Sequence, residues 1–296
     1  MKKILKMRKV ICMLCVFITF IISNSFIYDQ TVINADDISM SGAEEYDLIE
    51  DEELLTEEEL KDYGDVNADD TFTLDDVLKS DFSSVNAETD VLGDSEISLD
   101  SFDVNDWKIV LINKQHAVPE EYQFTLGTIK TSKGSMKCDE RIIPELQQMM
   151  QAADDDGVKL VICSPYRDYE RQIYLFQRKI KAYMKKKMSY LEAYRVTAQA
   201  VTVPGASEHQ IGLALDIVTD SYQSLNEGFE DTKAGQWLAQ HSYEYGFILR
   251  YPKGKEDITG ISYEPWHFRY VGKAAAKYMY EHNLTLEEFV ADLQVQ

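Results

Sequence analysis

Positively charged residues are scarce in this chain of 296 residues, which has 30 Lys and Arg against 52 Asp and Glu. Nucleic-acid binding needs a cationic footprint, so this composition argues against nucleic acid as a partner. The negative charge is concentrated in residues 36–106, where two basic residues stand against 26 acidic ones. Residues 107–296 are nearly neutral and rich in aromatic residues. We therefore expect an acidic segment at 36–106 and a folded domain at 107–296.

The sequence also has little that resembles an ordinary membrane span. Its apolar run from Val10 to Ile22 follows five basic residues among the first nine. This run is short for a bilayer core, which takes about 20 apolar residues. The pattern is typical of a secretory signal, so residues 1–35 predict an exported protein. Cleavage could follow Ser25 or Ala35; the alternative is an uncleaved anchor, which would be the only membrane contact.

Cysteine is rare as well, with four residues in the chain. Cys12 and Cys15 fall inside the signal, which leaves Cys138 and Cys163 for the mature protein. In an oxidising compartment these two could form a disulfide. The alternative is that both are small buried hydrophobic residues, and their separation in sequence does not decide between the two.

The acidic segment contains a weak internal repeat. Asp65, Asn67, Asp69 and Asp76 have the spacing of an EF-hand-type calcium loop, and the stretch resembles half of a dockerin-type repeat. Asp70 replaces the usual glycine of the turn, and the second copy lacks ligands. The segment is therefore interpreted either as a Ca²⁺ site at 65–76, with Phe72, Leu74 and Val77 packing on Ile97, Leu99 and Phe102, or as an acidic linker.

From Trp107 onward, helical and strand patterns alternate. Strands are expected at 107–112, 159–163, 214–218, 247–250 and 267–271. Helices are expected at 142–153, 169–188, 189–200 (with a Ser189/Glu192 capping box), 234–245, 273–281 and 286–293. Because the strands are short and irregularly joined, the predicted fold class is α+β, with a small, mainly antiparallel sheet flanked by helices.

A basic cluster lies on one of these helices, between Arg178 and Lys187. Such a run is typical of a solvated helix face. A contact with anionic wall polymers is the alternative, because a cationic patch attracts polyanions of any chemistry.

Three potential metal ligands stand out near the C-terminus. His209 and Asp216 belong to the string SEHQIGLALD, and His267 ends the string EPWH. Two imidazoles and one carboxylate match a catalytic zinc site, which leaves a fourth position for water. Glu264 is the candidate general base, because zinc chemistry on a peptide bond needs a nearby group to move a proton.

These two strings, in this order, closely resemble the VanY-type D-alanyl-D-alanine carboxypeptidases of the LAS family of zinc peptidases. The resemblance runs from about Trp107 to the C-terminus. It implies Zn²⁺ held by His209, Asp216 and His267, with Glu264 as the base. It also implies a LAS-type fold and peptidoglycan stem peptides as substrate. The N-terminal signal predicts that the protein is exported and is extracellular, at the cell wall or associated with the membrane.

A further string, SPYRDYERQ, resembles the family's Ser-Gly-Tyr-Arg segment, with Pro165 in place of glycine. The resemblance makes Arg167 a catalytic residue, and a guanidinium suits the oxyanion that forms at the scissile carbonyl. It makes Gln172 and Ser207 substrate-binding residues.

Several functions remain open at this point. Removal of the terminal D-Ala from a stem pentapeptide is the leading hypothesis. An L,D-carboxypeptidase acting on tetrapeptides and a free dipeptidase need the same zinc, base and arginine. A non-catalytic wall-binding module is the alternative from another class, and the presence of Glu264 argues against it.

Overall fold

The structure is a computed structural model that describes residues 72–78, 97–131 and 134–295. The predicted export signal lies outside the described residues, as do Asp65, Asn67 and Asp69 of the predicted calcium loop. Within the described part of the chain, no helix has the length and apolar character that crossing a bilayer requires.

A five-stranded sheet forms the centre of the domain, and each of its neighbouring pairs is antiparallel. The strand order is β1 (Phe72–Thr73), β4 (Val161–Ser164), β5 (Ala214–Val218), β7 (His267–Tyr270) and β6 (Phe247–Leu249). The strands are short, as expected. The prediction of an α+β fold with a small antiparallel sheet is confirmed.

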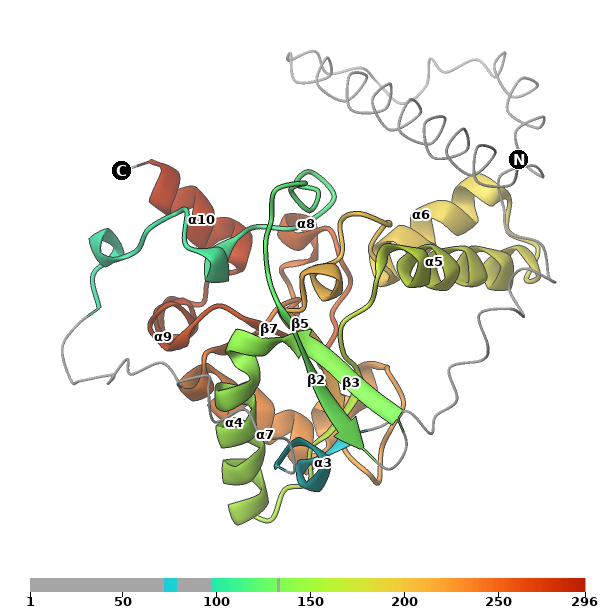
Figure 1. Cartoon of the computed structure of the whole chain (residues 1–296). Coiled ribbons are helices and arrows are strands. Elements are labelled where there is room, and N and C mark those ends of the chain that lie inside the picture. The colour runs from blue at the N-terminus through green and yellow to red at the C-terminus, as the bar shows by residue number, and fades with distance from the viewer. Residues whose placement is uncertain (1–71, 79–96, 132–133, 296) are drawn as a thin grey trace. The chain divides into compact units, whose positions relative to one another are not determined.

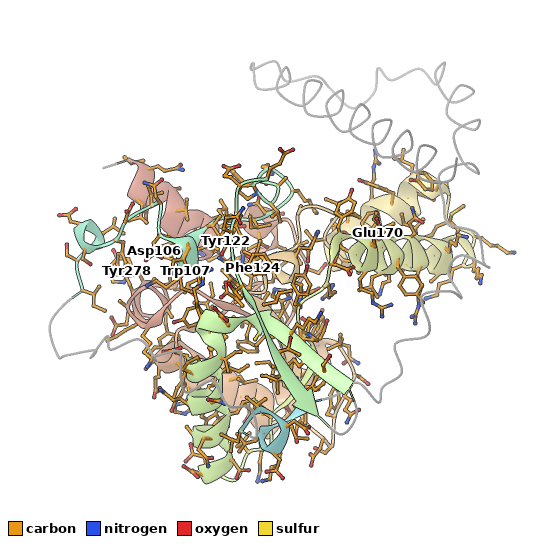
Figure 2. All side chains as sticks on the ribbon, viewed as in Figure 1. Asp106, Trp107, Tyr122, Phe124, Glu170 and Tyr278 are labelled. Carbon is orange, nitrogen blue, oxygen red and sulfur yellow. The ribbon has the colours of Figure 1, made fainter. Side chains whose placement is uncertain are left out.

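A separate hairpin of β2 (Leu126–Thr131) and β3 (Gly134–Asp139) was not predicted. Conversely, the predicted strand at 107–112 is wrong, because Trp107–Ile109 is a 3₁₀ turn and no strand follows before β2. Trp107 stacks on Tyr270, and its carbonyl accepts a hydrogen bond from the Tyr122 hydroxyl at 3.3 Å. Trp107 and Tyr122 are both labelled in Figure 2.

The described helices are arranged around the sheet (Figure 1). They are α3 (Leu74–Leu78), α4 (Ile143–Asp155), α5 (Tyr169–Met184), α6 (Tyr190–Ala200), α7 (Lys233–His241), α8 (Glu256–Thr259), α9 (Lys273–His282) and α10 (Leu286–Gln294). The predicted capping box of Ser189 and Glu192 starts α6 as expected. The helix predicted at 234–245 is divided, because α7 ends at His241 and a 3₁₀ turn covers Ser242–Tyr245.

Three groups of buried side chains stabilise this arrangement. The largest joins the sheet to α4 and α7, a second packs α9 against α10, and a third lies between α5 and α6. Cys138 is buried in the first group and Cys163 packs against it; both are free thiols, so the two are hydrophobic packing residues here. The basic residues Arg178, Lys179 and Lys185 to Lys187 are exposed on α5 and the turn that follows it.

The acidic segment contributes to two of these groups. Phe72 and Val77 are buried against the sheet and α4, whereas Leu99 and Phe102 pack on α9 and α10. The packing of these two sets on each other, which the calcium-site interpretation predicted, is therefore not found in this structure. The carboxylate of Asp76 accepts hydrogen bonds from the backbone and the hydroxyl of Thr73, both at 3.0 Å, at the start of α3. Residues upstream of the expected boundary at 107 thus form part of the folded domain.

Candidate active site

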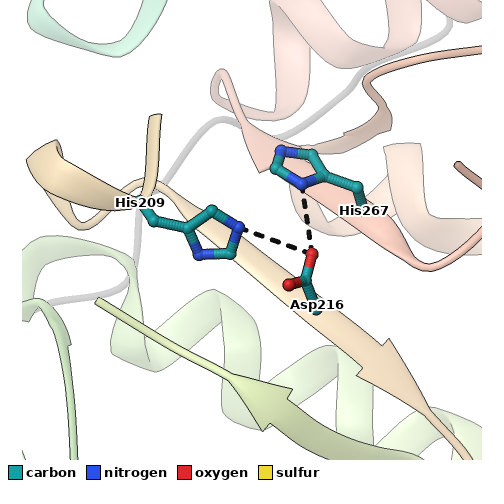
Figure 3. A group of neighbouring side chains, drawn as sticks. All are labelled: His209, Asp216 and His267. Atoms are coloured by element: carbon teal, nitrogen blue, oxygen red, sulfur yellow. Dashed lines mark hydrogen bonds and ion pairs between the residues drawn. The ribbon is translucent and has the colours of Figure 1, made fainter. Parts of the chain in front are cut away.

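Three side chains with metal-binding atoms meet at the middle of the sheet (Figure 3). His209 Nε2 lies 3.4 Å from Oδ1 of Asp216, and His267 Nδ1 lies 3.1 Å from the same oxygen. All three residues are buried, and their candidate ligand atoms lie within 4.8 Å of one another. Among the described residues, this is the one such group of His, Cys, Asp and Glu side chains.

Local structure explains why residues seven and 51 positions from Asp216 reach the same point. His209 lies on the 3₁₀ turn Glu208–Ile211, which ends at Gly212 with φ 72°. A Cβ atom at Gly212 would come within 2.6 Å of the Asp139 backbone nitrogen, so glycine is needed there for two reasons. The chain then enters β5, where Asp216 is paired directly with His267 of β7.

A backbone group fixes the orientation of the His209 ring. Its Nδ1 donates a hydrogen bond to the carbonyl oxygen of Pro165 at 2.9 Å. This leaves Nε2 as the nitrogen that faces Asp216, and Nε2 has no hydrogen-bond partner among the described residues. Ligating histidines usually have such a partner on the other ring nitrogen. Pro165 can make this hydrogen bond to the His209 ring because the bond uses only its carbonyl oxygen, which proline shares with every other residue.

The arrangement fits a zinc ion. A tetrahedral zinc with bonds of about 2.0–2.1 Å to nitrogen and oxygen sets its ligand atoms on the order of 3.3 Å apart. The separations of Asp216 Oδ1 from the two ring nitrogens, 3.4 and 3.1 Å, agree with that spacing, and all three ligand atoms lie within 4.8 Å of one another. The donor set of two imidazoles and one carboxylate is also one that catalytic zinc sites use.

Glu264 lies beside this group. It lies just before β7, and its Oε2 atom is 3.8 Å from Nδ1 of His267. The residue is 8% exposed. Burial raises the pKa of Glu264 to about 8, with Asp216 adding to the shift and His267 opposing it. The positive charge of a bound zinc would lower this pKa again, toward the range in which a carboxyl group accepts and releases a proton near neutral pH.

Arg167 lies on the other side of Asp216 and uses all three of its guanidinium nitrogens. Nη2 donates to Oδ2 of Asp216 at 3.0 Å, Nη1 to Oε1 of Gln172 at 3.1 Å, and Nε to the Ser164 hydroxyl at 3.0 Å. The Arg167 backbone nitrogen also donates to the carbonyl of His209 at 3.2 Å. The guanidinium is thus held in one orientation, with its charge next to the candidate ligands.

The remaining two predicted site residues are buried. Gln172 is fully buried and donates from Nε2 to the carbonyl of Thr202 at 2.6 Å, while its oxygen accepts from Arg167. Ser207 is 2% exposed and precedes the turn that bears His209. Gln172 therefore contacts Arg167, and Ser207 leads into the turn of His209. Direct contact of either residue with substrate stays a prediction.

A buried ion-pair network behind the site was not predicted. Glu208 is fully buried, and its Oε1 atom accepts hydrogen bonds from Arg250 and Arg269, both at 2.7 Å. Burial alone would raise the pKa of Glu208, but the two guanidinium groups outweigh it and hold that pKa well below its usual value. The sequence features that could have indicated this network are an acidic residue next to His209 and two arginines in the strands expected at 247–250 and 267–271.

The chain is similar to several known proteins. Residues 135–273 match the VanY family model, described as D-alanyl-D-alanine carboxypeptidase. The D-alanyl-D-alanine carboxypeptidase of Enterococcus faecalis is 40% identical over 189 residues, which are 64% of this chain and 67% of that protein.

Two solved structures are similar over about three fifths of the chain. The vancomycin resistance D,D-pentapeptidase VanY from a VanB-type cassette, solved as a mutant with Zn(II), is 40% identical, with a TM-score of 0.57 over 62% of this chain and 99% of that one. The LD-carboxypeptidase LdcB is 41% identical, with a TM-score of 0.51 over 61% and 84% of the two chains. This chain belongs to the VanY family of zinc peptidases.

Proposed function

We propose that this protein is a zinc-dependent D-alanyl-D-alanine carboxypeptidase that removes the terminal D-Ala from peptidoglycan stem peptides. The observation that carries the proposal is the convergence of His209, Asp216 and His267 on one point, with the buried carboxyl of Glu264 beside them. His209 would bind zinc through Nε2, His267 through Nδ1 and Asp216 through Oδ1. A bound zinc would act as a Lewis acid that activates water and polarises the scissile carbonyl.

Glu264 moves the proton in this proposal. Its carboxylate accepts a proton from the attacking water and then donates it to the nitrogen of the departing D-Ala. The base lies on the His267 side of the ligand group, at 3.8 Å from that ring. Its burial keeps the proton from exchanging freely with bulk solvent, which favours delivery to the leaving group.

Arg167 supplies fixed positive charge at the same place. Its Nη2 atom contacts the Asp216 oxygen that does not face the histidines. A guanidinium held by three hydrogen bonds needs little reorganisation when negative charge develops on the carbonyl oxygen. The side-chain oxygen of Gln172 accepts one of these hydrogen bonds and so maintains the orientation of the guanidinium. We propose that Gln172 and Ser207 form part of the wall of the substrate site.

The decisive experiment is a product assay with the full chain and defined stem peptides. We expect one zinc per protein and release of D-Ala from a pentapeptide, followed by mass spectrometry. His209→Ala should lose both the metal and the activity. A wild-type protein that binds zinc but releases nothing from any stem peptide would contradict the proposal and leave a non-catalytic wall-binding module.

An L,D-carboxypeptidase is the second candidate, because the LD-carboxypeptidase LdcB is as similar in sequence as the D,D-pentapeptidase. The same assay separates the two reactions. A D,D-enzyme shortens the pentapeptide to a tetrapeptide and stops there, whereas an L,D-enzyme shortens the tetrapeptide to a tripeptide. Free D-Ala-D-Ala as a third substrate tests for a dipeptidase.

We also propose that the protein is exported through residues 1–35 and acts at the wall. The basic and apolar start of the sequence supports this. The N-terminal sequence of the secreted protein distinguishes cleavage after Ser25 or Ala35 from a retained anchor.

Calorimetry with Ca²⁺ tests whether the 65–76 loop binds calcium. In this loop, the Asp76 carboxylate already accepts a hydrogen bond from the Thr73 backbone.

A further inference from the structure

The buried carboxylate of Glu208 divides its two oxygens between different tasks. Oε1 accepts from Arg250 Nε and Arg269 Nη1. Oε2 lies 3.5 Å from Nε2 of His267. Neither Oε2 nor this nitrogen has any other hydrogen-bond partner among the described residues. Among the described residues, each of these two buried polar atoms therefore has the other as its candidate polar partner.

The elements around Glu208 hold it in this place. Arg269 is two residues beyond His267 on β7, so the ring and this guanidinium belong to the same strand. The Arg250 backbone nitrogen donates to the His267 carbonyl at 3.2 Å, and its side chain binds Glu287 of α10 at 2.7 and 2.8 Å. Because both arginines bind Oε1, the other oxygen is left to face the ring.

This geometry suits one arrangement of the His267 proton when a metal is bound. A neutral imidazole has one N–H and one lone pair. When a metal takes the lone pair on Nδ1, the N–H is on Nε2, where the Glu208 carboxylate oxygen is placed to accept it. Nδ1 is the atom that faces Asp216 Oδ1 at 3.1 Å.

We propose that Glu208 is a positioning residue for metal binding, which holds His267 in the tautomer and orientation that ligate through Nδ1. The inference rests on the proposed function, since it takes His267 as a zinc ligand. A carboxylate behind a ligating histidine raises metal affinity, and loss of such a partner typically costs about 10–100-fold. Glu208 thus does for His267 what the Pro165 carbonyl does for His209.

The test is Glu208→Gln in the full chain. Glutamine has the same shape, and the two arginines require its oxygen, so its amide NH₂ group is turned toward Nε2. Two donors then face each other, which disfavours the N–H on Nε2. We expect the zinc dissociation constant, measured by competition with a chromophoric chelator, to rise by about 10–100-fold. Glu208→Asp keeps the charge but withdraws the carboxylate from the ring, and we expect about a tenfold rise.

Glu287→Gln is the matched control. It removes one carboxylate from the same arginine network without touching His267. Its melting temperature should fall, whereas its zinc affinity should stay close to that of the wild type. A second readout is the Nε2 proton of His267 in the zinc-loaded protein, whose NMR resonance should lie downfield in the wild type and move upfield in Glu208→Gln.

The outcomes distinguish a wrong metal site from a wrong role for Glu208. If His267→Ala binds zinc as the wild type does, the proposed metal site itself is wrong. If His267→Ala loses zinc while both Glu208 variants keep wild-type affinity, only the role of Glu208 is refuted. Equal losses of affinity in Glu208→Gln and Glu287→Gln would also refute it, because general stability of the network would then be the cause.

Discussion

The proposed base and the candidate metal ligands should make separable contributions, which a substitution at Glu264 can distinguish. Glu264→Gln keeps the shape of the buried side chain and leaves all three candidate ligands in place. We expect zinc content to stay the same and kcat to fall by about 10²–10⁴-fold, because proton transfer is lost. Metal analysis and the D-Ala release assay measure the two quantities. Turnover near the wild-type rate would remove Glu264 from the mechanism.

Arg167 offers a second test at the residue scale. Arg167→Lys keeps the charge, but a single ammonium cannot replace three hydrogen bonds to Ser164, Gln172 and Asp216. We expect kcat to fall on the order of ten- to a thousandfold with a smaller change in KM, since the interaction is strongest in the transition state. Zinc content serves as the control, because one of the lost bonds is to Asp216. A change confined to KM would indicate ground-state binding instead.

The positions of the candidate ligands could be predicted from sequence because each lies in a short string with recognisable chemistry. Glu208 could not be assigned in this way. Its partners Arg250 and Arg269 are 42 and 61 residues away, and only the pairing of β5, β6 and β7 brings them together. Gln172 was expected at the substrate, whereas its burial behind Arg167 depends on how α5 packs.

At the scale of elements, the short pair β1 and α3 is expected to stabilise the whole domain. Phe72 is 4% exposed and packs in the same group as the sheet and α4. Phe72→Ala should lower the free energy of unfolding by about 3 kcal/mol, because it leaves a cavity in the core. Leu78→Ala at the end of α3 is the control, since Leu78 is 46% exposed and its loss should cost less than about 0.5 kcal/mol. Urea denaturation of the two variants measures the difference, and equal midpoints would mean that this segment does not contribute.

Elements were predictable where a periodic pattern agreed with the final packing. The boundaries of β5 and the start of α6 follow directly from such patterns. The run at 107–112 has β-branched residues but no neighbouring strand, so Ile109 and Ile112 are buried in different hydrophobic groups instead. The β2–β3 hairpin has few apolar residues to mark it. Its position depends on close packing against the start of α4. At Gly127, for example, an added Cβ atom would come within 2.5 Å of Ile143 Cδ1.

For the whole molecule, removal of zinc should lower stability. A ligand that binds only the folded state stabilises it by about 4 kcal/mol when its free concentration is a thousand times the dissociation constant. We therefore expect a chelator to lower the melting temperature and added zinc to restore it. His209→Ala should show no such response. A wild-type melting temperature that is independent of zinc would contradict the metal site.

Strand β1 has one more consequence, for the solubility of shortened forms of the protein. It pairs through Phe72 and Thr73 with Ile162 and Val161 of β4, and so occupies the edge of the sheet. A chain begun at residue 107 would leave the backbone N–H and C=O groups along that side of β4 unpaired. Exposed edges of this kind recruit strands from other molecules. Expression of the peptidase domain without residues 72–78 should therefore yield self-associating protein, however intact its zinc ligands are.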